Sequence, residues 1–240
     1  MTPSDRLILA LDLTDPKAAI DLVERLSGRI RIFKIGSILF TNAGPSLINE
    51  IQNRGGEVFL DLKFHDIPNT TAGAALQAAR LGVRMLTLHT LGGKEMLQTT
   101  RETVHQAAIR EQFPLPFLLG VTILTSMDQT ALQQTLSSPS STEEMVVHLA
   151  RLADEAGMDG VIASPLELKL LRKALPTPFL LITPGIRPLS VERQDQKRTA
   201  PPRLAIEMGA DYIVVGRPIL EAKDPVIAVE NLLKEMETGG

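Results

Sequence analysis

The sequence contains no cysteine, and aromatic residues make up only 3 % of its 240 residues, with no tryptophan and one tyrosine. The absence of cysteine excludes disulfides, cysteine–zinc sites, iron–sulfur clusters and thiol catalysis, and it suits a reducing cytoplasm. The scarcity of aromatic side chains argues against base-stacking platforms and aromatic cages. Thiol chemistry and stacking recognition are thereby removed from the possible functions.

A strong charge of one sign and long apolar runs are also missing. The 25 Lys and Arg residues oppose 28 Asp and Glu residues, and this balance argues against general nucleic-acid binding, which needs a basic face. No apolar run approaches the ~18–20 residues of a membrane span, and the first six residues lack the features of a signal peptide. We therefore expect a soluble, cytoplasmic protein with no nucleic-acid or membrane partner.

Eight short apolar runs alternate with eight segments of helical spacing. The continuously apolar runs, typical of strands buried on both faces, cover residues 7–13, 30–35, 58–64, 83–89, 117–124, 160–163, 179–183 and 212–215. The segments of helical spacing cover residues 16–26, 45–53, 71–81, 94–110, 143–155, 166–175, 202–208 and 225–236. Eight β–α units with right-handed crossovers predict an α/β fold, a (β/α)8 TIM barrel, with residues 1–240 as one domain.

An open, doubly wound sheet is the alternative. It is disfavoured because the Gly-rich dinucleotide loop is missing after the first strand, where residues 11–14 read LDLT. Two connections, 125–142 and 184–202, are longer than a barrel requires. Both follow strands at the face where such barrels carry their active sites.

The densest polar signal lies at the end of the third strand, where Asp61 and Lys63 alternate with apolar residues. Alternation places both side chains on the inner face of the barrel, near its mouth. A single buried ion pair that only locks the strand is the simpler interpretation. However, Asp12 and Lys34 end the first and second strands, so four ionisable groups converge on one mouth. Such a set indicates a site for an ionic substrate.

The second signal follows strands seven and eight, where barrels often bind phosphate. Gly216 lets the backbone approach a ligand, and Arg217 supplies a planar fork for phosphate oxygens. An ordinary turn would explain this pair alone. Arg187 and Gln196 in the preceding long loop favour a phosphate site.

The histidines carry less weight. His65 and His89 end neighbouring strands, but no further His or Cys ligand stands beside them, so we expect hydrogen-bonded structural roles and no metal.

Residues 61–70, DLKFHDIPNT, resemble the signature of the orotidine 5′-phosphate decarboxylase family. Further similar motifs follow in family order: LALD at 9–12, FKIG at 33–36, LTSM at 124–127, TPGIR at 183–187 and GRP at 216–218. The resemblance covers nearly the whole chain and is closest to bacterial members without a fused domain. It implies decarboxylation of orotidine 5′-monophosphate to UMP and CO2, the last step of de novo UMP synthesis, without a cofactor.

The resemblance also implies roles for individual residues. Lys63 corresponds to the general acid that protonates C6 of the pyrimidine, and Asp61 to the carboxylate beside the departing CO2. Lys34 and Asp66 complete an alternating network with these two.

Asp66, Ile67 and Thr70 correspond to residues that reach across a homodimer interface into the partner's site. Asp12 resembles the ribose ligand and Thr125 a contact to the pyrimidine edge.

The phosphate side would comprise four residues, namely Arg187, Gln196, Gly216 and Arg217.

Two rival functions remain open. A sugar-phosphate decarboxylase or aldolase of the same superfamily shares the Asp-x-Lys-x-x-Asp pattern but uses Mg²⁺ and an enediolate. The residues around that pattern and Thr125 favour the nucleotide. A catalytically silent nucleotide-phosphate sensor is the other rival, and it has no need of the proton donor Lys63.

Overall fold

The computed structural model describes residues 1–188 and 199–237. Eight parallel strands form a closed barrel in chain order, and β1 pairs with β8 through Leu7 opposite Ile213. The strands are β1 (Leu7–Ala10), β2 (Ile32–Gly36), β3 (Glu57–Phe64), β4 (Met85–His89), β5 (Phe117–Val121), β6 (Gly160–Ile162), β7 (Leu180–Thr183) and β8 (Tyr212–Val215). The predicted barrel and all eight strands are confirmed, although several strands are shorter than their apolar runs.

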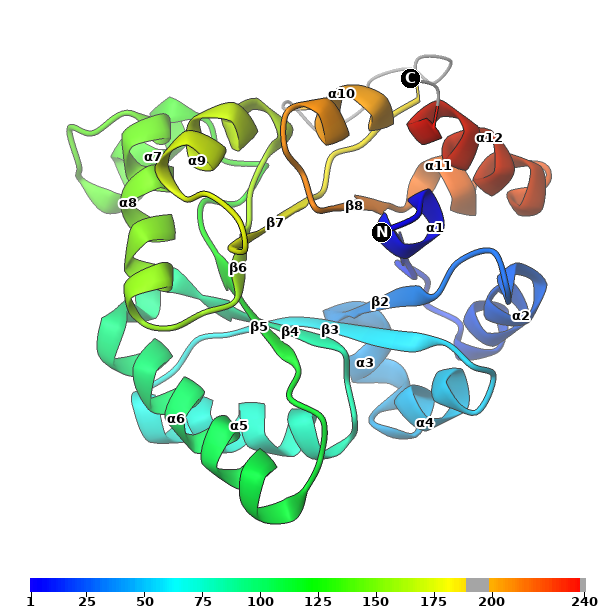
Figure 1. Cartoon of the computed structure of the whole chain (residues 1–240), viewed down its shortest axis with the longest axis horizontal. Helices are drawn as coiled ribbons and strands as arrows, with labels where there is room; N and C mark the ends of the chain where they lie inside the picture. Colours follow the sequence, from blue (N-terminus) through cyan, green and yellow to red (C-terminus); the bar gives the residue numbers. More distant parts are fainter. Residues whose placement is uncertain (189–198, 238–240) are drawn as a thin grey trace.

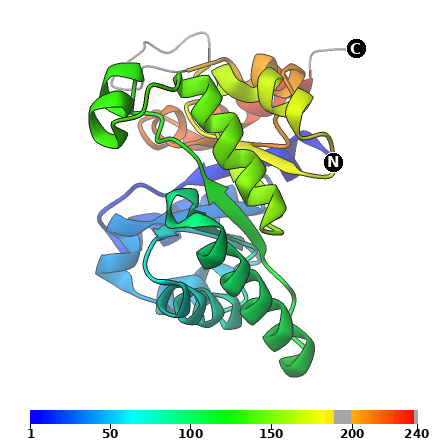
Figure 2. The same ribbon diagram turned by 90° about the vertical axis from the view of Figure 1, so that its left-hand side faces the viewer.

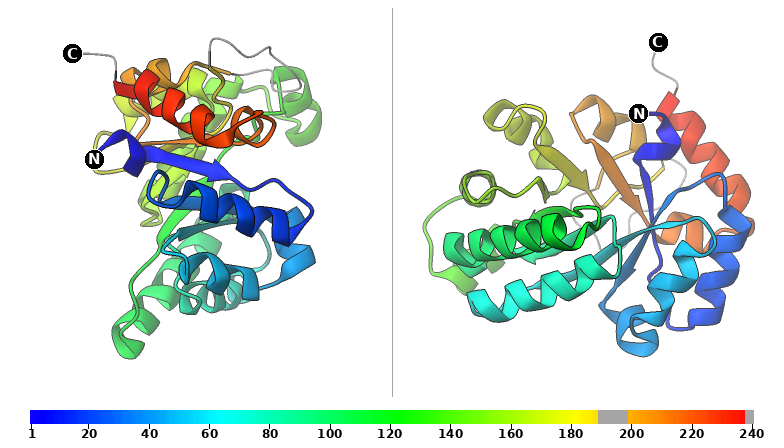
Figure 3. Two further views of the ribbon diagram at one scale, coloured as in Figure 1. Left: turned by 90° about the vertical axis from the view of Figure 1, so that its right-hand side faces the viewer. Right: turned by 60° about the horizontal axis from the view of Figure 1, so that its bottom comes forward.

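Helices surround the strands (Figures 1 and 3). The eight predicted helical segments correspond to α2 (Pro16–Leu26), α4 (Ser46–Gln52), α5 (Pro68–Arg80), α6 (Gly93–Glu111), α8 (Thr142–Glu155), α9 (Leu168–Ala174) with the 3-10 turn η2 (Pro165–Glu167), α10 (Pro202–Glu207) and α12 (Pro225–Glu237). Figure 2 shows the long helices α6 and α8 on the outer surface. The α2 helix begins where Asp15 accepts a hydrogen bond from the Lys17 N–H and Pro16 fixes the first turn.

Some short elements were not expected from the sequence. They are α1 (Pro3–Arg6), α3 (Ser37–Ala43), the turn η1 (Thr90–Gly92), α7 (Gln129–Leu136) and α11 (Arg217–Leu220). The α7 helix lies within the segment 125–142 that the sequence suggested to be a long loop. Asp128 caps it by accepting from the Ala131 N–H, and Leu132 is the buried residue of the helix. One cap and one buried residue give too weak a periodicity to detect.

Two hydrophobic layers fill the molecule. Inside the barrel, one cluster includes Ile8, Phe59 and Met85, while a larger cluster between strands and helices includes Leu9 and Leu60. Side chains therefore alternate between the inner and the outer layer along each strand. This alternation leaves the last inward positions to face the mouth at the carboxyl ends of the strands.

The opposite end of the barrel, its floor, carries a repeated ionic contact. Asp159, just before β6, accepts from the Leu118 N–H of β5 at 2.8 Å and pairs with Arg101 of α6 at 3.2 Å. Asp211, just before β8, accepts from the Leu181 N–H of β7 at 2.7 Å and pairs with Arg172 of α9 at 2.6 Å. Each contact ties one helix to two neighbouring strands.

Among the residues that the structure describes, no helix is both long and apolar enough to cross a membrane. The first helix, α1, contacts α12, so the two ends of the barrel sequence meet on one side of the molecule (Figure 1).

Candidate active site

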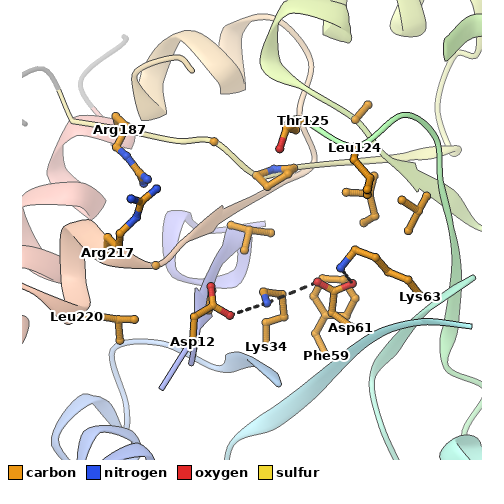
Figure 4. Close-up of a pocket in the computed structure, with 18 of the residues that line it drawn as sticks. Asp12, Lys34, Phe59, Asp61, Lys63, Leu124, Thr125, Arg187, Arg217 and Leu220 are labelled. Carbon is orange, nitrogen blue, oxygen red and sulfur yellow. Dashed lines mark hydrogen bonds and ion pairs between the residues drawn. The ribbon is translucent and has the colours of Figure 1, made fainter. Parts of the chain in front are cut away.

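A cavity of about 670 Å³ opens at the carboxyl ends of the strands (Figure 4). Its wall includes Asp12, Lys34, Asp61 and Lys63 from the first three βα units. The sequence-predicted convergence of these four charges on one mouth is confirmed. Leu62 and the other apolar residues of this stretch pack instead against the outer core, as alternation requires.

The four charged side chains form a continuous chain of alternating sign. Lys34 Nζ lies 3.1 Å from Asp12 Oδ1 and 3.5 Å from Asp61 Oδ2, and Lys63 Nζ lies 2.9 Å from Asp61 Oδ1. The two inner members are well shielded, because the side chains of Lys34 and Asp61 are only 11 % and 13 % exposed. Removal of one partner from such a buried pair costs about 3–5 kcal/mol, because the other charge is left without compensation.

This row of four charged side chains keeps Asp61 ionised. Burial alone would raise the pKa of the Asp61 carboxyl, but Lys34 and Lys63, with hydrogen bonds from Lys63 and Thr87, bring that pKa below its usual value. A fixed carboxylate therefore lies beside a cationic amine at the cavity wall. This is an arrangement that can repel a substrate anion and deliver a proton.

Lys63 has an unusual backbone. Its φ is +51°, in the left-handed region that residues with a Cβ rarely adopt, and β3 contains a bulge at this point. Leu60 pairs with Leu86 and Phe64 with Leu88, so three residues of β3 lie opposite the single residue Thr87. Bulges of this kind re-aim side chains beside active sites. Neither the bulge nor the part played by Thr87 was foreseen from the sequence.

Two arginines approach from the other side of the cavity. Arg187 follows β7 and Arg217 begins α11, and their guanidinium groups point toward one another (Figure 4). Gly216 also lines the cavity, and a Cβ added there would lie 3.5 Å from the Ala10 Cβ and 3.6 Å from Asp12 Oδ2. The predicted association of Arg187, Gly216 and Arg217 is therefore present.

Gln196, the fourth predicted member of this group, lies outside the described residues. Thr125 lines the cavity beside Leu124 (Figure 4).

Three predicted site residues do not line the cavity of their own chain. Asp66, Ile67 and Thr70 lie in the turn after β3 and at the start of α5, and all three are exposed. The Asp66 carboxylate accepts from the Ile67 N–H at 2.6 Å, and the Ile67 side chain is 67 % exposed. The exposure of Asp66 and Ile67 leaves both side chains accessible to a second chain. Their contact with a partner stays a prediction.

His65 and His89 stack on one another with ring centroids 5.2 Å apart. His89 Nδ1 accepts from the Leu91 N–H, which bears out the expected hydrogen-bonded role for this residue. Burial, His65 and Lys63 lower the pKa of the His89 imidazole. In residues 1–188 and 199–237, no three His, Cys, Asp or Glu side chains are grouped so that they could hold a metal ion.

Comparisons with known proteins find relatives over nearly the whole chain. Residues 5–232 match the model of the "Orotidine 5'-phosphate decarboxylase / HUMPS family". Proteins named orotidine 5'-phosphate decarboxylase from Moorella thermoacetica and Syntrophotalea carbinolica are 46 % and 49 % identical to this chain. The alignments cover 99 % and 96 % of it and 94 % of each relative.

A solved structure of orotidine 5'-phosphate decarboxylase from Lactobacillus acidophilus superposes with a TM-score of 0.86 at 38 % identity. It covers 98 % of this chain and 100 % of that one.

Proposed function

The chain belongs to the orotidine 5′-phosphate decarboxylase / HUMPS family and is an enzyme of its decarboxylase branch, and we propose that it converts orotidine 5′-monophosphate to UMP and CO2 without a cofactor. One observation carries the proposal. A charge-balanced chain of four side chains lines one side of the cavity, and two arginines line the other. A nucleotide with a carboxylate at one end and a phosphate at the other fits that division.

The chemical difficulty of the decarboxylation explains why four charged side chains are needed. Loss of CO2 breaks the C6–carboxyl bond and leaves the electron pair on C6, in an sp² orbital without a conventional electron sink. The ammonium of Lys63, held at 2.9 Å by Asp61, would stabilise that developing charge and then transfer a proton to C6. The neutral amine regains its proton from solvent, so the sum is substrate plus H⁺ giving UMP plus CO2.

Asp61 would lie against the substrate carboxylate and oppose it. Lys34 and Lys63 lower the pKa of Asp61 and favour its ionised form, and departure of CO2 would relieve the opposition between the two carboxylates. Lys34 would hold Asp61 in place through its other oxygen, and Asp12 would turn its exposed carboxylate toward the ribose hydroxyls. Thr125 would contact the pyrimidine edge.

The phosphate would be bound by Arg187, Gln196, Gly216 and Arg217. Two guanidinium groups that point toward one another attract an anion between them, and planar arginine forks match phosphate oxygens. Binding energy at this remote group can organise the site around the reacting carbon.

The proposal also includes a homodimer with shared sites, in which Asp66, Ile67 and Thr70 enter the partner's pocket. Their exposure beside the cavity mouth supports it. Residues 1–240 are assigned to one barrel domain, and a cytoplasmic location is proposed because the lack of cysteine suits a reducing compartment.

An assay of orotidine 5′-monophosphate decarboxylation by UV absorbance, with and without EDTA, tests the proposal. We expect turnover that EDTA leaves unchanged, with UMP and CO2 formed in equal amounts. A requirement for Mg²⁺ together with turnover of a sugar phosphate would establish the rival enediolate chemistry instead. Binding of UMP without any turnover would establish the sensor.

A further inference from the structure

Thr87 occupies the inward-facing position of β4 opposite the bulge in β3. Its neighbours Leu86 and Leu88 belong to the outer core and Met85 to the inner one, so Thr87 points into the barrel. Thr87 is completely buried. It is absent from the cavity wall, so it does not touch a bound substrate there.

The Thr87 hydroxyl makes two hydrogen bonds to the catalytic strand. Oγ1 accepts from the backbone N–H of Lys63 at 2.9 Å and donates to Asp61 Oδ1 at 3.0 Å. The same carboxylate oxygen accepts from Lys63 Nζ at 2.9 Å. A closed ring thus runs from the amide of Lys63 through the hydroxyl and the carboxylate back to the ammonium of the same residue.

This ring explains how Lys63 keeps its left-handed backbone. A residue with a Cβ at φ +51° is strained by about 1–3 kcal/mol and persists only where its surroundings hold it. The bulge removes the regular partner of the Lys63 amide in the β3–β4 ladder, and Thr87 takes that place. A buried amide left without an acceptor would be costly.

Two other buried threonines, Thr90 and Thr100, make no comparable link. The hydroxyl of Thr90 donates to the Val121 carbonyl, and that of Thr100 donates to the Met96 carbonyl. Both bonds end on backbone oxygens rather than on an ionised side chain.

We propose that Thr87 is a positioning residue, whose hydroxyl holds the Lys63 backbone and the Asp61 carboxylate together so that the ammonium of Lys63 is fixed toward the cavity. The inference rests on the proposed decarboxylase function. It adds that the proton donor is placed from β4, by a residue that never meets the substrate.

Isosteric replacement tests this role. Thr87→Val keeps the shape and removes the hydroxyl, and we expect kcat to fall about 10- to 100-fold, as loss of a hydrogen bond to a charged group predicts. The KM for orotidine 5′-monophosphate and the affinity for UMP should stay within about threefold of the wild type, because the arginines are untouched. Thr87→Ser restores the hydroxyl and should recover kcat to within about threefold. Thr100→Val, an equally buried change on α6, is the matched control and should retain full activity.

A second measurement does not depend on activity. In hydrogen exchange, the amide of Lys63 should exchange at least about tenfold faster in Thr87→Val, with no such change in Thr87→Ser. If Thr87→Val does not fold, Thr87→Ala is measured in its place with the same expectations.

Wild-type kcat in Thr87→Val would overturn the inference. So would an equal loss in the valine and serine variants, or a loss of UMP binding as large as the loss of kcat. Absence of decarboxylation by the wild type would instead overturn the proposed function, and the Lys63 amide would still report whether Thr87 holds the bulge.

Discussion

The two sides of the cavity hold their charges in different ways. On the strand side, Asp12, Lys34, Asp61 and Lys63 alternate in sign, and their formal charges sum to zero. On the loop side, the guanidinium groups of two arginines point toward one another (Figure 4).

The four charges of the strand side pair with one another, whereas two like charges that point toward one another suit an anionic ligand. We therefore propose that the strand side is the catalytic side and that the loop side binds the phosphate, and each prediction below perturbs one side alone.

The largest effect is expected on the strand side. Lys63→Ala removes the proposed proton donor, so kcat should fall by at least about 10⁴-fold while UMP binding remains measurable. Steady-state turnover and UMP titration measure the two effects separately. Lys94→Ala, which breaks a surface ion pair with Glu155 between α6 and α8, is the control and should leave both unchanged. Equal losses of binding and turnover would mean that Lys63 positions the ligand.

A second test examines whether the strand side is completed by another chain. Lys63→Ala and Asp66→Ala chains, each nearly inactive alone, are mixed under conditions that allow subunit exchange. In a hybrid, the pocket of the Asp66→Ala chain keeps its own Lys63 and receives an intact Asp66 from its partner. Half of the dimers should be hybrids with one intact site each, so about one quarter of wild-type activity should return. Hybrids that form without recovery would assign Asp66 to its own pocket.

The smallest effect is expected on the loop side. Arg217→Ala should mainly raise KM and reduce kcat/KM about 10- to 150-fold, since a charge-assisted hydrogen bond contributes about 1.5–3 kcal/mol. Orotidine, which lacks the phosphate, should be far less sensitive to the change. Arg203→Ala, which removes an exposed pair with Glu207 on α10, is the matched control. If the nucleoside loses as much as the nucleotide, Arg217 does not bind phosphate.

Much of the strand side could be predicted from the sequence, because a strand repeats every two residues and a barrel has only one interior. Asp12, Lys34, Asp61 and Lys63 lie at or beyond the midpoints of three successive apolar runs, so their convergence follows from fold and alternation. On the loop side, the positions of Arg187 and Arg217 after the seventh and eighth strands already favoured a phosphate site, and the resemblance to a family implied the same role.

The bulge at Lys63 could not be predicted. No glycine marks its left-handed residue, and the Thr87 hydroxyl that accepts from its amide lies 24 positions away along the chain. The only available signal was a threonine within the apolar run 83–89, and a buried threonine hydroxyl can equally well bond a carbonyl, as those of Thr90 and Thr100 do. The α7 helix was missed for a related reason, because its single buried residue gives no periodic pattern.

The repeated aspartate–arginine contacts at the floor of the barrel affect which parts of it can accept substitutions during evolution. Asp159 and Asp211 fix the register of β5 with β6 and of β7 with β8 at the amino ends of these strands. The segments that bear Thr125 and Arg187 leave the opposite ends. Substitutions or insertions in those segments therefore need not disturb the contacts that align the strands. The contacts that align the strands thus lie at one end of the barrel, and the segments that can change to suit a new ligand lie at the other end.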